Sequence, residues 1–559
     1  MVAFVTTRLS ADLLVRFLRS LSAGGVVLGT LFFVASLTPT LVPRTYVTQG
    51  ILSGACFAAG YGIGVAWRWL WQYMQLPEPN GRVQRWLKIA SALVCTVIAL
   101  SFLWRTTEWQ NSIRGLMGLE PVTSAHPFEV CVIAVITFVA LIVLARLFKA
   151  VLRITSNAVG RFVPPRISQV IGFTVSALLF WTIANGLLIR TALHLLDSSF
   201  AAFDALIEPD RVRPTSPLKT GSAASLVAWE KLGRAGREFV ATGPSAAEIQ
   251  AFTQGPALEP IRVYVGLGAS DTVEQRAKLA LDELIRVGGF DRSVLIVITP
   301  TGTGWVDPSA MDAVEYLHNG DVASVALQYS YLSSPLSLLV QPGYGAEASR
   351  ALFAAVYGYW TTLPKDHRPK LYLHGLSLGA MNSERSAELF EILGDPIQGA
   401  LWSGPPFESR IWRRATDART PGSPAWLPQF GDGSVVRFMN QHGGTVAPGT
   451  RWGPMRIVYL QYASDAITFF DYRDLYRRPD WMSAPRGPDV SPQLRWYPVV
   501  TMLQLALDMG MATSTPMGYG HVYAPEHYVD AWFAVTDPKG WTADRIEQLK
   551  RHLAQRSGR

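Results

Sequence analysis

The stretch LYLHGLSLGA, residues 371–380, decides the fold predicted for the C-terminal half of the chain. Its core, GLSLG at 375–379, matches the G-x-S-x-G pattern of a nucleophile elbow, a sharp turn that carries a serine from a strand into a helix. The apolar LYLH before the motif predicts the strand, and the run that begins at Ala380 is compatible with the helix. We therefore predict that Ser377 is a nucleophile whose hydroxyl projects above a sheet.

Strand-like and helix-like segments alternate around this motif. Apolar runs predict strands at 261–267, 294–299, 322–327, 371–374, 399–403 and 457–460, and amphipathic patterns predict helices at 272–287 and 346–359. Such alternation is typical of an α/β domain, a mostly parallel sheet with helices on both faces. At 405–452 we expect a lid-like insertion, whose aromatic and aliphatic side chains either line an acyl-chain pocket or pack the insertion on the core.

A serine on such a turn requires an acid and a histidine later in the chain. Asp465 closely follows the predicted strand at 457–460, where the acid is expected. His521 ends a glycine-rich loop near the C-terminal end and is the predicted base. In these roles His521 accepts the proton of Ser377 and Asp465 orients the imidazolium, so neither a metal ion nor another cofactor is needed.

Other residues compete for these roles. Asp471 and Asp474 also follow the same strand, and Asp508 lies in an apolar helical pattern. His527, at a predicted helix start, is the rival base, whereas His374 lies on the strand before the motif and is expected to point elsewhere. The alternative role for the predicted acid is a helix N-cap, where aspartate is common.

The oxyanion of acyl transfer needs backbone N–H donors. We expect one from Leu378, directly after the nucleophile, and one from the loop that follows the strand at 294–299. That loop, PTGTGW at 300–305, contains two glycines, and Thr303 is the predicted donor within it; a plain glycine turn is the alternative. The substrate pocket is predicted around four further residues: Gly302, Gly304, Trp305 and Leu376.

Apolar segments in the first 190 residues predict five membrane-spanning helices. They run over 20–43, 45–66, 89–104, 130–145 and 167–189. The third and fourth are shorter than the roughly 20 residues that a spanning helix needs, and buried soluble helices are the alternative for them. In the second, Gly50-x-x-x-Gly54 and Gly60-x-x-x-Gly64 predict faces for helix packing.

Basic residues are concentrated in alternate loops of this region. Twelve Lys and Arg lie in the N-terminus and in the loops after the second and fourth segments, against three in the other loops. Because cytoplasmic loops are enriched in Lys and Arg, we predict a multi-pass protein of the plasma (inner) membrane with a cytoplasmic N-terminus and, after five crossings, an extracytoplasmic catalytic domain.

The domain plan has three parts. We predict a transmembrane bundle at 1–190, a juxtamembrane stretch and linker at 191–220 with an amphipathic segment at 192–207, and a catalytic domain at 221–559. The first 200 residues hold 16 Lys and Arg against 6 Asp and Glu, so the formal net charge of +8 belongs to the bundle. The catalytic domain has no basic cluster of the kind that binds nucleic acid, and the sequence does not indicate an oligomeric state.

Several stretches of the C-terminal half share one resemblance. They are GSAASLVAWEKLGRAGREFV (221–240), PIRVYVGL, LYLHGLSLGA, ALWSGPPFESRIW, WMSAPRGPDVSPQLRWYPVVTMLQLALDM and GYGHVY. Together they resemble an actinobacterial family of membrane-anchored α/β-hydrolases with an N-terminal multi-helix region. The resemblance implies this fold and a triad that falls on Ser377, Asp465 and His521, but no substrate. Members of that family often have Asp-Pro after the acid-bearing strand, whereas Ala466 follows the aspartate here.

The sequence thus predicts a membrane-anchored serine hydrolase, esterase- or lipase-like, that cleaves ester bonds of membrane or cell-envelope lipids. An acyltransferase, in which a sugar or lipid hydroxyl replaces water, would use the same triad. A non-catalytic scaffold or a transporter with a relic hydrolase domain is the alternative of another class. The intact order of serine, aspartate and histidine argues against the scaffold, and the absence of ionisable groups well inside the spans argues against the transporter.

Overall fold

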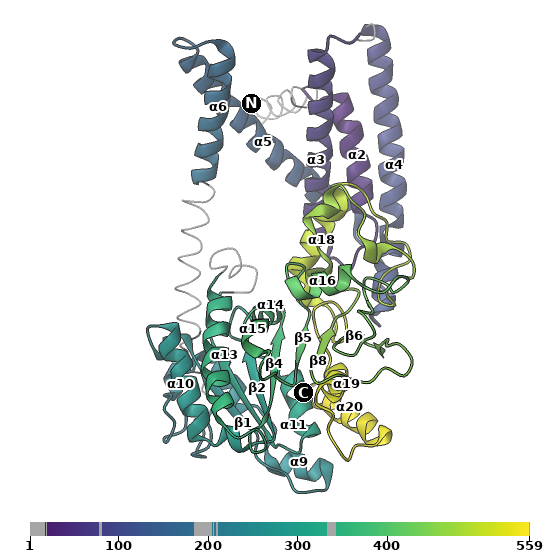
Figure 1. Ribbon diagram of the computed structural model, residues 1–559. Helices are drawn as coiled ribbons and strands as arrows, with labels where there is room; N and C mark the ends of the chain where they lie inside the picture. Colours follow the sequence, from purple (N-terminus) through teal and green to yellow (C-terminus); the bar gives the residue numbers. More distant parts are fainter. Residues whose placement is uncertain are drawn as a thin grey trace, which may run out of the picture. The chain divides into compact units, whose positions relative to one another are not determined.

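The computed structural model describes residues 17, 20–77, 81–183, 204, 206–207, 211–332 and 343–557. The chain divides into two compact units, whose helices and strands are labelled in Figure 1. The helical unit consists of Met1–Gly186, Phe470–Met482 and Pro488–Met511. The sheet unit consists of Leu187–Phe469, Ser483–Gly487 and Ala512–Arg559. Most of the predicted amphipathic segment at 192–207 lies outside the described residues.

The helical unit is built from apolar helices. In chain order they are α2 (Ala23–Ser36), α3 (Tyr46–Tyr73), α4 (Gly81–Leu116), α5 (Pro127–Val159), α6 (Pro165–Trp181) and, much later, α18 (Val500–Met511). Three of them, α3, α4 and α5, are long and apolar enough to cross a membrane, and α2 is a shorter apolar helix. α2 ends before the predicted limit of its segment because Pro39 and Pro43 disfavour helical backbone. The predicted fifth span begins in α6, and its residues 184–189 lie outside the described residues.

Two glycine pairs on α3 let the neighbouring helices approach closely. A Cβ atom at Gly60 would lie 2.6 Å from the carbonyl oxygen of Leu28 in α2. A Cβ atom at Gly54 would lie 2.5 Å from the carbonyl oxygen of Ala134 in α5. The other glycine of each pair faces the same neighbour. The helix-packing role predicted for both pairs is therefore confirmed.

A segment from the C-terminal half completes the helical unit. Most of residues 470–511 belong to it, including the 3-10 turns η5 (Tyr472–Leu475) and η6 (Asp480–Met482) and the helix α18. Val500 of α18 is buried in one apolar cluster with Ala35 of α2 and with Leu52 and Cys56 of α3. The apolar pattern around Asp508 predicted a helix, but it did not indicate that this helix packs on the N-terminal bundle.

Among the described residues, eight strands form one sheet. They are β1 (Ile261–Val265), β2 (Val294–Thr299), β3 (Val322–Leu327), β4 (Lys370–Leu376), β5 (Gly399–Ser403), β6 (Val436–Asn440), β7 (Gly443–Gly444) and β8 (Arg456–Leu460). Their spatial order is β1-β3-β2-β4-β5-β8-β6-β7, and every neighbouring pair is parallel except β6 with β7. The mostly parallel sheet predicted from the sequence is confirmed, with β2, β3 and β5 at the predicted limits.

Helices cover both faces of the sheet (Figure 1). The sheet unit contains α8 (Gly233–Ala241), α9 (Ala246–Thr253), α10 (Val273–Arg286), α11 (Pro308–Leu317), α13 (Tyr344–Thr362), α14 (Leu378–Glu384), α15 (Leu389–Ile392), α16 (Arg410–Asp417), α17 (Ala466–Phe469), α19 (Pro525–Thr536) and α20 (Ala543–Ser557). Thr299 of β2 donates a hydrogen bond to Ser349 of α13 (3.0 Å), whereas His374 of β4 packs against Trp532 of α19. Because Thr299 and His374 point to opposite faces in this register, α13 and α19 cover opposite faces.

The stretch predicted as a lid-like insertion, 405–452, is in part a piece of the sheet. It begins with α16, but from Val436 it forms β6 and β7. Phe438 of β6 is buried and stacks on Tyr459 of β8, with ring centroids 5.2 Å apart. Trp412 of α16 is also buried, and its indole N–H donates to the side-chain oxygen of Gln461 (2.6 Å). Of the two roles expected for these aromatic residues, packing on the core is the one these contacts show.

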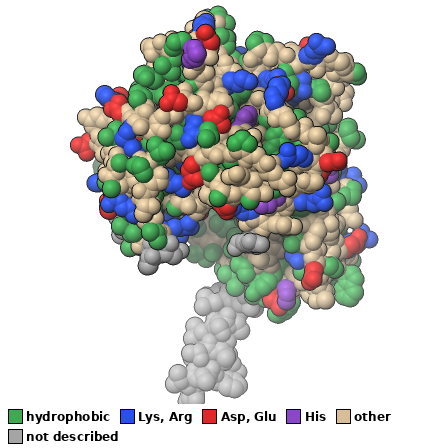
Figure 2. Space-filling view, turned by 90° about the horizontal axis from the view of Figure 1, so that it is seen from below, with side chains coloured by type: hydrophobic (Ala, Val, Ile, Leu, Met, Phe, Trp, Pro, Cys, Tyr) green, Lys and Arg blue, Asp and Glu red, His purple; other side chains and the backbone are tan. Residues whose placement is uncertain are grey.

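Charged side chains of opposite sign lie close together in the sheet unit. Arg262 of β1 is buried and pairs with Glu315 (2.7 Å) and Asp312 (2.9 Å) of α11, and Arg556 of α20 reaches the same aspartate (3.2 Å). Breaking such a pair is costly because the remaining charge stays buried. On the face of the molecule shown in Figure 2, Lys and Arg side chains are interspersed with Asp and Glu.

Candidate active site

Ser377 lies at the sharp turn between β4 and α14, with φ 58° and ψ −126°. Residues other than glycine rarely adopt this combination, so the backbone of Ser377 is strained. The side chain is buried at the end of the strand. The strand–turn–helix arrangement predicted for the GLSLG motif is therefore present.

Gly375 and Gly379 allow this turn to close. A Cβ atom at Gly375 would overlap the backbone of Gly379, and a Cβ atom at Gly379 would overlap the carbonyl oxygen of Thr299 at the end of β2. The two positions thus bring the first turn of α14 against the end of β2, where the loop at 300–305 begins.

Asp465 and His521 are joined by a hydrogen bond of 2.7 Å between carboxylate oxygen Oδ2 and Nδ1. Asp465 lies between β8 and α17 and is fully buried. The hydroxyl of Tyr523 donates to the same oxygen (2.8 Å), and the N–H of Ile467 donates to Oδ1 (2.9 Å). Both carboxylate oxygens are therefore fixed, and one of them faces the imidazole.

Tyr523 was not predicted as a site residue, although it lies two positions after His521 in the GYGHVY stretch. Burial, together with the negative charge of Asp465, raises the pKa of the Tyr523 hydroxyl well above its usual value. The hydroxyl therefore keeps its proton at neutral pH and donates a hydrogen bond to the carboxylate. The sequence shows only that Tyr523 lies near the candidate catalytic histidine; that its hydroxyl is buried, and therefore requires a partner, is visible only in the structure.

The loop that carries His521 is held on both sides. The N–H of His521 donates to the carbonyl oxygen of Ala512 (2.9 Å), and the N–H of Gly520 donates to the hydroxyl of Ser464 (2.9 Å). With Nδ1 bound to Asp465, the other ring nitrogen, Nε2, is buried and has no hydrogen-bond partner within the part of the chain that the structure describes. This nitrogen can accept a proton from a group placed beside it.

Ser403 and Gly404, at the end of β5, contact Ser377 and His521, respectively. The N–H of Ser377 donates to the carbonyl oxygen of Ser403 (2.9 Å), and a Cβ atom at Gly404 would lie 2.5 Å from Cε1 of His521. No hydrogen bond joins the Ser377 hydroxyl to His521 in the described residues. The structure thus brings Asp465 into direct contact with His521, whereas Ser377 is linked to the neighbourhood of His521 through the chain at Ser403 and Gly404.

Comparison with protein-family models places these residues in a known family. Residues 261–549, more than half of the chain, match an α/β-hydrolase family, and residues 37–244 match the N-terminal region of that family. The chain belongs to this α/β-hydrolase family. A search of curated proteins and a search of solved structures each found no match.

The predicted oxyanion donors of this α/β-hydrolase lie on two elements. Leu378 is the first residue of α14, and the first N–H groups of a helix have no acceptor within it. In the 300–305 loop, the N–H of Thr301 donates to the carbonyl oxygen of Trp305 (3.0 Å), and the N–H of Gly304 donates to that of Thr301 (2.9 Å). These two donors are engaged within the turn itself.

Thr303, the donor predicted in this loop, is exposed at its tip, and its carbonyl oxygen accepts a hydrogen bond from Gln328 (3.5 Å). Of the predicted pocket residues, Leu376 directly precedes the nucleophile and is buried. Gly302 and Gly304 are buried in the loop, and Trp305 is half-buried. The roles of Thr303 and of these four residues remain predictions.

The competing acids of the hydrolase are engaged elsewhere. Asp471 pairs with Arg473 (2.6 Å) and caps η5, and Asp474 accepts a hydrogen bond from the N–H of Asp471 (3.1 Å). Asp508 pairs with Arg44 in the helical unit (2.7 Å). Among the four aspartates considered, Asp465 is the one in contact with His521.

The competing histidines have partners of their own. Nδ1 of His374 bonds to the carbonyl oxygen of Leu401 (2.8 Å), so this side chain points away from the turn, as predicted. Nδ1 of His527 bonds to the hydroxyl of Tyr462 (2.5 Å). Burial lowers the pKa of each imidazole to about 4. Among the described residues, no group of three or more His, Cys, Asp and Glu is arranged to hold a metal ion.

Proposed function

We propose that this α/β-hydrolase is a serine hydrolase that cleaves ester bonds of membrane or cell-envelope lipids. The observation that carries the proposal is the 2.7 Å hydrogen bond between Asp465 and His521, which leaves Nε2 of a buried imidazole available as a base. The strained turn at Ser377, whose N–H donates to the carbonyl oxygen of Ser403, supplies the nucleophile.

The proposed reaction has two steps. The Ser377 oxygen attacks the ester carbonyl while Nε2 of His521 takes the hydroxyl proton, and His521 then returns that proton to the leaving alcohol. Water, activated by the same nitrogen, hydrolyses the acyl-serine. Asp465 stabilises the imidazolium in both steps, and the N–H of Leu378 stabilises the oxyanion.

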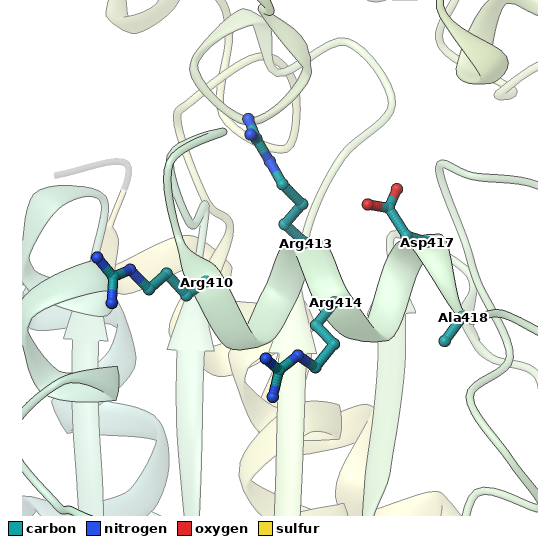
Figure 3. Close-up of a pocket in the computed structure, with 5 residues that line it drawn as sticks. All are labelled: Arg410, Arg413, Arg414, Asp417 and Ala418. Atoms are coloured by element: carbon teal, nitrogen blue, oxygen red, sulfur yellow. The ribbon is translucent and has the colours of Figure 1, made fainter.

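Two features support a lipid substrate. The first is the set of helices long and apolar enough to cross a membrane. The second is α16, where Arg410, Arg413, Arg414, Asp417 and Ala418 line a hollow of about 550 Å³. Figure 3 shows the three guanidinium groups extending from α16 in different directions, so they do not form one tight anion site. Arg410 and Arg414 are exposed, and exposed arginines suit a surface of anionic headgroups.

A hydrogen bond joins α16 to α14, the helix that follows the candidate nucleophile. Glu384, at the end of α14, accepts a hydrogen bond from the N–H of Ile411 in α16. The other oxygen of the same buried carboxylate accepts from the hydroxyl of Tyr459 (3.0 Å). The end of α14, the helix that directly follows Ser377, is thus bonded to α16, the helix that carries the arginines.

Labelling with a fluorophosphonate probe tests the mechanism. Ser377→Ala should abolish both labelling and ester turnover, and Asp465→Asn should lower turnover by orders of magnitude. Asp471→Asn is the matched control, because it removes a carboxylate that does not contact His521 and should leave turnover within about twofold of wild type. Turnover that persists in Ser377→Ala would refute the mechanism.

Chain-length dependence tests the substrate class. We expect long-chain esters presented in detergent or vesicles to be cleaved faster than acetyl esters, and anionic vesicles to support more turnover than neutral ones. Replacing both Arg410 and Arg414 by Gln should reduce that difference between vesicles. A tenfold preference for acetyl esters, with no gain at an interface, would leave a small-ester hydrolase instead.

A further inference from the structure

A buried ion pair joins the N-terminal and C-terminal segments of the helical unit. Nη2 and Nε of Arg44, between α2 and α3, lie 2.7 and 2.9 Å from Oδ1 of Asp508 in α18. Their side chains are 1% and 0% exposed. An aspartate this deeply buried is costly unless it is paired, so the two residues depend on each other.

Helix α18 also satisfies the backbone where α2 ends. Oδ2 of Asp508 accepts the N–H of Leu41 (3.0 Å). The side-chain amide of Gln504, one turn earlier, donates to the carbonyl oxygens of Ser36 (3.2 Å) and Thr38 (3.3 Å). Buried backbone groups need such partners, so these hydrogen bonds help to fix α18 against the end of α2.

The course of the chain connects this helix to the candidate site. α18 lies in the sequence between Asp465 and His521, the acid and base of the proposed triad. Its last residue, Met511, is followed directly by Ala512, whose carbonyl oxygen accepts the N–H of His521 (2.9 Å). A short segment of chain and one backbone hydrogen bond therefore connect the end of α18 to His521.

We propose that Arg44 and Asp508 are positioning residues, whose ion pair locks α18 into the helical unit and so places His521 for proton transfer. This inference rests on the proposed function. It assigns the N-terminal bundle a part in catalysis beyond anchoring. It is consistent with the family matches, because Arg44 lies within the N-terminal match and Asp508 within the hydrolase match.

Steady-state kinetics on the full chain test the proposal. In Asp508→Asn the amide keeps the size of the side chain but has no charge, so α18 loses its ion pair with Arg44. Because a misplacement of about 1 Å at a reacting group costs roughly a hundredfold in rate, we expect kcat on a soluble ester to fall about tenfold to a hundredfold. KM should stay within about twofold, since the base acts in the chemical step and not in binding.

A matched variant separates positioning from general destabilisation. Arg262→Met breaks a comparably buried arginine–carboxylate pair in the sheet unit, with side chains 4% and 0% exposed. Measured below its melting temperature, this variant should keep kcat within about twofold of wild type. An equal loss of kcat in Arg262→Met and Asp508→Asn would overturn the proposal.

Two further outcomes are decisive. Folded Asp508→Asn with the kcat of wild type would overturn the proposal. If that variant does not fold, Gln504→Ala takes its place, because it removes the bonds to Ser36 and Thr38 without leaving a buried charge; a fall in kcat supports the proposal and an unchanged kcat overturns it. A wild-type protein whose Ser377 is not labelled by the probe would instead refute the proposed function.

Discussion

Strain at the turn of Ser377 predicts an unusual order of stability among its variants. With φ 58° and ψ −126°, a residue that has a Cβ atom costs about 1–3 kcal/mol, and glycine avoids this cost. Glycine also raises the entropy of the unfolded chain, which offsets about 0.4–1 kcal/mol. Ser377→Gly should therefore be more stable than Ser377→Ala by about 1 kcal/mol. The loss of the hydroxyl is common to both variants and cancels.

Thermal unfolding of the detergent-solubilised protein measures this difference. About 1 kcal/mol corresponds to roughly 2–4 °C in Tm for a large domain. Ser383, inside α14, is the matched control: there glycine should be less stable than alanine by about 0.5–1 kcal/mol, because its backbone is helical. If Ser377→Ala melts at the same temperature as Ser377→Gly, or higher, the turn is not strained and this reasoning fails.

Three other predictions concern topology, pH and the core. A reporter that is active only outside the cytoplasm, fused after Arg559, should be active; activity of a cytoplasmic reporter there instead would show that the loop charges were misread. Burial lowers the pKa of His374 to about 4, so between about pH 6.5 and 4 the unfolded chain binds a proton that the folded chain does not. The free energy of unfolding should therefore fall as the pH is lowered through this window, and His374→Gln should show a smaller fall in denaturant titrations. Arg262→Met should cost about 3–5 kcal/mol, because Glu315 would remain buried without its partner; a loss under 1 kcal/mol by denaturant titration would contradict this.

The parts of the site that could be predicted are those set by local sequence or by chain order. The strand–turn–helix at Ser377 could be predicted because such a turn needs small residues at fixed neighbouring positions, whereas the role of Ser377 as nucleophile stays a prediction. Asp465 was preferred because the acid follows a strand, and the structure places it against His521. Tyr523 was missed because its bond to the carboxylate spans 58 positions and leaves no local pattern.

In the fold, as in the site, the features that could be predicted are those set by local sequence. Buried parallel strands appear in the sequence as short apolar runs, so the first and last residues of β2, β3 and β5 were predicted correctly. β6 was hidden within a segment taken for an insertion, because a strand near the edge of a sheet has a weaker apolar pattern. No periodicity could show that α18 packs on the N-terminal bundle, since Arg44 and Asp508 are 464 positions apart.

The return of residues 488–511 to the helical unit has a practical consequence for making the protein in pieces. A soluble fragment begun at residue 221 would still carry α18, with Val500 and Asp508 deprived of the helices that bury them. The N-terminal bundle made alone would in turn keep Arg44 without its counter-ion. Either fragment should aggregate unless this segment is redesigned with it. A single cut in the gene therefore does not give two pieces that each fold alone, and expressing the two pieces together is the simpler route to a folded sample.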